Sequence, residues 1–214
     1  MAATPGYVLT DQHGRFSFDM PPLVRGVALV APAGFISPEV AALVAAEQSI
    51  CWRVVADGWE TDGLRRRPLG TALVEDVVEL PAFSADELVA WAIVLLPQRS
   101  IRSWARHWLQ GDPGARSAGA AHRAAERLLA IEAWPCRAAA AAANGAPLKD
   151  LKSAVVASAE LSRGVPPGTP TDARSPEHIG GRERVEAGLM PALQRARAIL
   201  AGHYPAVKFD EPLA

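Results

Sequence analysis

The five histidines are the residues best suited to acid–base chemistry at neutral pH, because an imidazole titrates at about pH 6.5. They are His13, His107, His122, His178 and His203. No two of them stand four residues apart on an expected helix, and no HExxH sequence occurs, so the pattern typical of a helical zinc site is missing. His178 follows Glu177, and a loop histidine beside a carboxylate can act as a general base. The competing interpretation is an exposed histidine with no catalytic role.

Two cysteines, Cys51 and Cys136, offer thiol chemistry, but neither belongs to a CxxC motif. A thiol needs a neighbouring base to serve as a nucleophile, whereas Cys51 stands beside Ile50 and Trp52 in an apolar run. Free cysteines of this kind behave as small buried hydrophobic residues. Their unpaired use is typical of a reducing compartment. We therefore expect a cytoplasmic protein, or one inside a larger assembly.

Glycine-rich phosphate cradles are missing as well, since neither GxxxxGKS/T nor GxGxxG occurs. Gly180-Gly181 precedes an expected helix whose amides could bind an anion, but a lone Gly-Gly pair is a weak signal. We predict no cofactor, no metal site and no catalytic residue. The alternative is a small metal-independent enzyme that uses the loop at 164–182, with Glu177 and His178 as its first candidates.

Arginines Arg99, Arg102 and Arg106 are the candidate anion contacts, because they share one face of the helix expected at 98–110, opposite two tryptophans. This face suits nucleic acid, or it is an ordinary solvated surface. Net charge is −1, whereas nucleic-acid binders usually carry a basic excess. A second basic run, Arg65–Arg67, is expected in a turn. Nucleic-acid contact is therefore a disfavoured alternative.

Strand signals dominate the N-terminal portion, residues 1–83. Residues 7–10 and 15–18 predict a hairpin around a four-residue loop, and further strands are expected at 24–31 and within 69–80. A helix begins at Ser37-Pro38-Glu39, which supplies an N-cap, a proline and a first-turn acid. Residues 50–55 fit either the end of that helix or a strand.

Apolar residues recur with a helical period in the helical portion, residues 84–163. Ser84 and Glu87 form the sequence of a capping box, and helices are expected at 85–96, 98–110, 115–134, 137–143 and 147–162. A Pro/Gly linker follows at 164–181, and then a C-terminal helix and extended arm at 182–214. The fold class is α+β, mainly α: a small N-terminal β portion, with a hairpin plus strands, followed by a helical bundle or short irregular helical solenoid.

A protein partner or self-association is the function that this pattern favours. The chain contains no catalytic motif, and its short strands leave an edge that a partner strand could pair with. The candidate interface residues are Trp59, expected in a turn, and three apolar side chains of the arm, Tyr204, Val207 and Phe209. Of the 22 basic residues only three are lysines, which suggests GC-rich codons. We expect a non-catalytic adaptor or structural subunit of a bacterial or phage multiprotein complex, with no membrane span because no apolar run reaches about 20 residues.

Overall fold

The computed structural model describes residues 4–16, 21–30, 32, 34–62, 65–96, 101–129, 132–162 and 176–202. The chain divides into two compact units, Met1–Ala82 and Phe83–Ala214, which are described separately below. In the described residues helices occupy more of the chain than strands do. The α+β, mainly α fold class is therefore confirmed.

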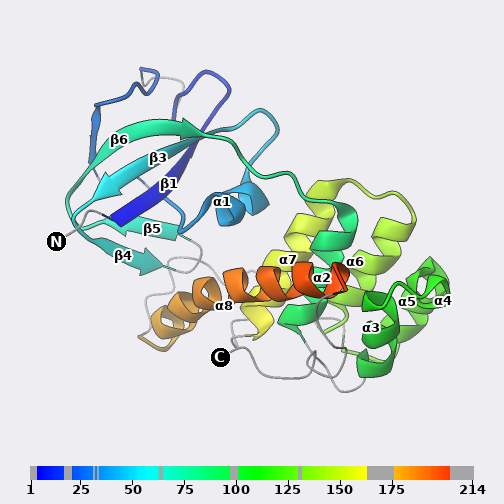
Figure 1. Cartoon of the computed structure of the whole chain (residues 1–214). Helices are drawn as coiled ribbons and strands as arrows, with labels where there is room; N and C mark the ends of the chain where they lie inside the picture. The colour runs from blue at the N-terminus through cyan, green and yellow to red at the C-terminus, as the bar shows by residue number, and fades with distance from the viewer. Residues whose placement is uncertain are drawn as a thin grey trace. The chain divides into compact units, whose positions relative to one another are not determined.

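The first unit is built on a curled antiparallel sheet. Strands β1 (Thr4–Thr10), β3 (Ile50–Ala56), β6 (Thr71–Val78) and β2 (Ala28–Val30) follow one another in that spatial order, and Figure 1 shows β1, β3 and β6 side by side. Strands β4 (Trp59–Asp62) and β5 (Arg65–Pro68) pair with each other. Helix α1 (Pro38–Val44) begins where Ser37 caps the amide of Val40, as its sequence predicts.

Gly34 and Phe35 connect β1 of the four-stranded sheet to β5 of the two-stranded sheet. The Phe35 amide donates to the Tyr7 carbonyl (2.6 Å) and the Tyr7 amide donates to the Phe35 carbonyl (3.0 Å). On its other side, Gly34 exchanges two backbone bonds with Arg66 of β5, at 2.7 and 2.6 Å. β3 leads directly into β4, and β5 leads directly into β6, so these strands form one long hairpin. The four backbone bonds hold the β4–β5 end of this hairpin near β1.

Trp59 fills the space that this curl encloses. Its indole lies where a side chain at Gly6 would stand, so a Cβ at that position would overlap the ring. Gly34 is also close, because a Cβ there would lie 3.6 Å from the ring and 3.1 Å from the Tyr7 carbonyl oxygen. The surrounding core consists of Val8, Leu23, Leu29, Trp52, Val54, Ala56, Ala72 and Val74, with Ile50 and Trp59 packed against it.

Two expectations for this unit need correction, and a third stays a prediction. Trp59 lies in β4 and is partly buried, not in a turn. The Arg65–Arg67 run lies in strand β5, where Arg67 stands opposite Glu60, a favourable cross-strand pair of opposite charges. The expected turn forms, since the Gly14 amide donates to the Asp11 carbonyl. β1 pairs with β3, and the Asp11 amide donates to the Arg15 carbonyl across the turn at 3.0 Å. Residues 17 and 18 lie outside the described residues, so the hairpin with 15–18 stays a prediction.

The second unit is helical and is organised around α2 (Ala85–Leu95). The other helices are α3 (Arg102–Leu109), α4 (Pro113–Arg116), α5 (Ala118–Ala125), α6 (Trp134–Ala143), α7 (Leu148–Ser162) and α8 (Pro176–Leu200). Helix α2 packs against α6, α7 and α8 (Figure 1), and every residue from Leu88 to Leu95 is buried. The apolar character of α2 on all sides predicts this central position.

Polar bonds fix α2 to α8. The fully buried indole of Trp91 donates to the Leu189 carbonyl (3.0 Å). At the start of α2 the predicted capping box forms, because Ser84 and Glu87 each accept from the other's amide. Arg197 of α8 then donates to the same Glu87 carboxylate at 3.0 Å. One glutamate thus caps one helix and holds another.

Helix boundaries differ from the expected ones at two places. The helix expected at 115–134 is divided into α4 and α5, which Asp112 and Ser117 cap, while α6 begins at Trp134. Pro135 does not interrupt α6 but stands in its first turn, where a missing N–H costs nothing. Helix α8 begins at Pro176, so the last six residues of the expected linker 164–181 are helical. The other linker residues lie outside the described ranges.

We predict that Gly6→Ala destabilises the first unit by about 1–3 kcal/mol, because the added methyl group overlaps the Trp59 ring. Gly70→Ala is the matched control, since a Cβ there meets no atom within 4 Å. Urea unfolding followed by tryptophan fluorescence measures both. Equal stability of the two variants would contradict this packing.

Acid should weaken the second unit through Glu87. Burial alone would raise the pKa of Glu87, but the Ser84 amide and the Arg197 guanidinium together hold that pKa below its usual value of 4.5. A carboxylate with a depressed pKa contributes stability above pH 4.5 and loses it as the pH falls through the lower folded value.

Glu87→Gln should therefore remove up to about 1 kcal/mol at neutral pH and flatten the decline of stability below pH 4.5. Thermal unfolding between pH 7 and pH 3 measures this change. Glu126→Gln, at an exposed glutamate of the same unit, is the control. An unchanged acid slope in the Glu87 variant would rule out this role.

Candidate functional site

Exposed apolar side chains gather in the first unit. Among the described residues, eight of the ten exposed large hydrophobic side chains lie in residues 1–82, and six belong to β2, β6 or the segments beside them. These six are Val24, Val27, Val30, Leu69, Leu73 and Val77. Scattered exposed apolar residues are ordinary, but a gathered group marks an interaction surface.

Strand register places four apolar residues in one line across the sheet. Pro5 pairs with Val55, Val55 pairs with Leu73, and Leu73 pairs with Ala28. Directly opposed residues of antiparallel strands point to the same face. Their sequence neighbours, such as Val54, belong to the core, so these four lie on the outer face. We call Pro5, Val55, Leu73 and Ala28 the outer apolar row.

The row ends at β2, the last strand of the four-stranded sheet. Val30 of β2 is 85% exposed and Leu73 of β6 is 46% exposed. On the other side of the row, Arg53 forms an ion pair with Glu75 at 2.7 Å and stands opposite Asp76 in the strand register. The outer apolar row and Val30 therefore form an apolar surface that reaches β2, the last strand of this sheet among the described residues.

Sequence reasoning missed this surface, although a signal for it exists. An antiparallel sheet with one solvated face shows alternating apolar and polar residues, whereas strands covered on both faces read as continuous apolar runs. Residues 27–31 (VALVA) and 72–74 (ALV) are continuous. Such runs are typical of strands that are covered on both faces.

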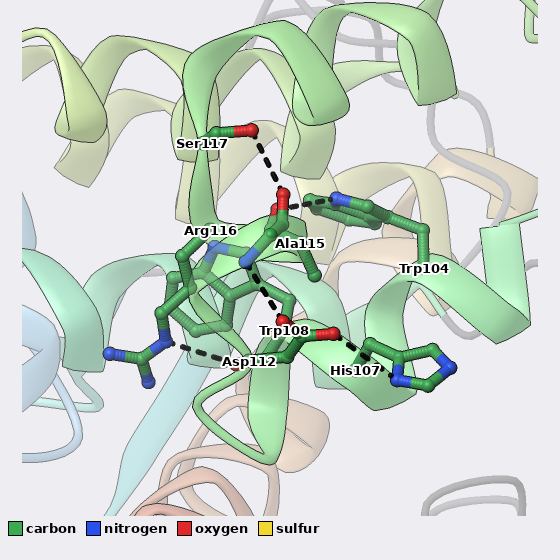
Figure 2. Close-up of polar contacts among 8 residues, drawn as sticks. Trp104, His107, Trp108, Asp112, Ala115, Arg116 and Ser117 are labelled. Atoms are coloured by element: carbon green, nitrogen blue, oxygen red, sulfur yellow. Dashed lines mark hydrogen bonds and ion pairs between the residues drawn. The ribbon is translucent and has the colours of Figure 1, made fainter.

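A second cluster, in the helical unit, is polar. Figure 2 shows Arg116 of α4 lying over the Trp108 ring, 4.6 Å from its centroid. The Arg116 Nε donates to the Trp108 carbonyl (3.1 Å), and its Nη1 donates to Asp86 of α2 (2.7 Å). The Trp104 indole donates to the Ala115 carbonyl (3.0 Å). These bonds fasten α4 to α2 and α3, which is a structural role.

The same corner contains an exposed histidine–carboxylate pair. The Nδ1 of His107 lies 3.5 Å from Asp112 (Figure 2), whose other carboxylate oxygen accepts from the Gly114 amide at 2.8 Å. A carboxylate can orient a histidine for general-base catalysis, but that chemistry needs a nucleophile within reach. The nearby Ser117 hydroxyl instead donates to the Gly114 carbonyl and caps α5. The arrangement is that of consecutive helix caps.

Burial makes both thiols unreactive. It raises the pKa of Cys51 to about 11 and the pKa of Cys136 to about 12. Because the thiolate is the nucleophile and the metal ligand, neither side chain is suited to either role at neutral pH. Within the described ranges, no group of three His, Cys, Asp or Glu side chains is placed to hold a metal ion. Nor does any helix there combine the length and apolar character needed to cross a bilayer.

Some predicted site residues can be placed and others cannot. Arg102 and Arg106 lie on α3, where both are partly buried and both interact within the protein. Their guanidinium groups are therefore less accessible to a phosphate than fully exposed arginines would be. Trp59 directs its ring to Gly6. Both roles, anion contact and interface, stay predictions.

Other candidates fall where side chains are not described. Arg99 and the arm residues Tyr204, Val207 and Phe209 lie outside the described residues. Glu177 and His178 lie in the first turns of α8, and the structure describes only their backbone.

Comparison with known proteins identifies no relative: no family model, no curated protein and no solved structure matches this chain. The candidate site therefore depends on the geometry alone.

We predict that Arg116→Lys lowers stability by about 1 kcal/mol, because lysine keeps the charge but loses the Nε bond and the planar contact over Trp108. Arg123→Lys, at an exposed arginine of α5, should change stability little. Thermal unfolding compares the two variants. A larger loss from the Arg123 substitution would contradict the structural role of Arg116.

Proposed function

We propose that this protein is a non-catalytic interaction protein, an adaptor or structural subunit of a bacterial or phage complex, that binds a protein partner through the outer apolar row and Val30. The carrying observation is the gathering of exposed apolar side chains beside β2 and β6. Covering apolar surface is favourable by about 25 cal/mol per Å². A partner would thus gain binding energy at a row that contains no charged side chain.

The alternatives have less support. Cys51 and Cys136 are unsuited to catalysis because burial raises the pKa of both thiols. Arg102 and Arg106, the described members of the basic face, already interact within the protein. No specific observation supports the enzyme or the nucleic-acid alternative, whereas the exposed apolar side chains beside β2 and β6 support protein interaction.

Leu73→Lys tests the proposed surface. Leu73 is about half exposed at the centre of the row, so lysine should fold there but place a charge against any partner. We expect association to weaken at least tenfold, as for a central interface residue. Leu129→Lys is the matched control, because Leu129 is 71% exposed but lies in the helical unit.

Size-exclusion chromatography with light scattering, on tagged full-length protein recovered from its native host, gives the readout. A partner or defined oligomer that is lost with Leu73→Lys and kept with Leu129→Lys supports the proposal, and mass spectrometry identifies the partner. A monomer with nothing bound would overturn it. Equal retention by both variants would also overturn it.

A further inference from the structure

The sequence contains a single asparagine, Asn144, and a glycine follows it. The pair stands in the turn between two helices, because α6 ends at Ala143 and α7 begins at Leu148. Both Asn144 and Gly145 are exposed. Since α6 and α7 pack against α2 and against each other, this turn sets the path between two helices that cover the centre of the unit.

A complete C-terminal motif ends α6. The Gly145 amide donates to the Ala142 carbonyl at 3.0 Å. The Ala146 amide donates to the Ala141 carbonyl, also at 3.0 Å. Gly145 has a φ of 73°, in the left-handed region that glycine adopts without strain. These features define a Schellman motif with Asn144 as the C-cap, and they satisfy carbonyls of the last turn that would otherwise lack a partner.

The same two residues can react with each other. Asparagine is a thermolabile residue, and a following glycine removes the side chain that would hinder attack by the next backbone nitrogen. The Gly145 nitrogen forms a bond to Cγ of Asn144, and the bond from Cγ to the carboxamide nitrogen breaks. That nitrogen leaves as ammonia with the proton of the Gly145 amide. Water then opens the succinimide ring at either carbonyl, which leaves aspartate or isoaspartate.

The folded motif keeps the reacting atoms apart. Ring closure requires the Gly145 nitrogen to eclipse Cβ of Asn144 about the Cα–C bond. At the observed ψ of 9°, this nitrogen eclipses the backbone nitrogen of Asn144 instead, roughly a third of a turn from Cβ. The proton that the Gly145 nitrogen must lose is also engaged in the bond to Ala142. The turn must therefore open before the ring can form.

Neither product restores the motif. Aspartate places a negative charge at the end of α6, where the helix dipole disfavours an anion. Isoaspartate adds a methylene group to the main chain ahead of Gly145, so the amides of Gly145 and Ala146 can no longer meet both of their carbonyls at once. Because the released ammonia is lost to solvent, each event is permanent and the altered turn accumulates with time.

We propose that Asn144 is a deamidation site gated by the C-terminal motif of α6: the closed turn blocks succinimide formation, and one reaction leaves the turn permanently weakened. The site lies in the second unit and does not rest on the protein-binding role proposed for the first. Its tests therefore fail or succeed separately from those of the outer apolar row.

Mass spectrometry measures the gating on full-length protein at mildly alkaline pH. Trypsin releases residues 138–149 as one peptide, because Arg137 and Lys149 bound it, and conversion of the amide to an acid changes its mass. We expect deamidation to be at least about tenfold slower in the folded protein than in the same chain unfolded in guanidinium chloride, since it must wait for local opening. Equal rates would overturn the gating, and an unreacted Asn144 in the unfolded chain would overturn the site itself.

Ala142→Gly loosens the last turn without altering the Asn-Gly pair. Glycine loses more conformational entropy in a helix than alanine does, so deamidation of the folded protein should accelerate about two- to fivefold. Ala124→Gly is the matched control, because Ala124 is also partly buried and lies in the last turn of α5. Equal acceleration by the two substitutions would indicate opening of the whole unit and would contradict a gate at this motif.

Asn144→Asp and Asn144→Gln test the consequence of the reaction. Aspartate reproduces the charge of one product, whereas glutamine stays neutral and would have to close a larger ring. We expect Asn144→Asp to lower the midpoint of thermal unfolding by about 1–4 °C relative to Asn144→Gln. Equal midpoints would rule out that the charge weakens the turn.

Discussion

The first unit depends on one packing constraint, the contact of the Trp59 indole with the backbone at Gly6 and Gly34. An aromatic ring can lie flat against a strand only where the strand lacks a side chain, and glycine provides this at β1 and at the joining segment. The ring allows the β4–β5 half of the long hairpin to fold over β1. The backbone bonds from Gly34 and Phe35 then hold that position. Without glycine at position 6 the ring has no room, and the curl would open.

Closing the inner face determines what remains outside. With Trp59, Trp52, Val54 and Val74 enclosed, the residues that alternate with them must face outward. In an isolated unit those positions are normally polar. Here Val55 and Leu73 occupy them, and Val30 extends the apolar surface to the last strand. Register therefore determines which positions face outward. At Val55, Leu73 and Ala28 this sequence places apolar residues there, although polar residues would leave the inner core unchanged.

Local features of the fold could be predicted from the sequence, whereas its long-range features could not. The caps at Ser37 and Ser84 depend on residues three positions away, and both are confirmed. The buried helix α2 also follows from its composition. By contrast, β1 pairs with residues forty to fifty-two positions later, and no local pattern predicts that pairing. The Asp57-Gly58 pair predicts a turn at Trp59, whereas the structure places this residue in β4. The ring's partner, Gly6, is visible only once the strands are assembled.

The same contrast explains why the sequence did not predict the outer apolar row, although it predicted a protein-interaction role. Sequence reasoning searched for charged, aromatic and reactive residues, and the structure uses most of these internally: Arg116 over Trp108, Asp112 at a helix cap, and the thiols in the core. The outer apolar row, by contrast, carries no motif. Valine and leucine give no chemical signature in a sequence, and their meaning depends on which face they occupy. That face is set by the register of β2, β3 and β6, so a function carried by this surface becomes readable only after the sheet has formed.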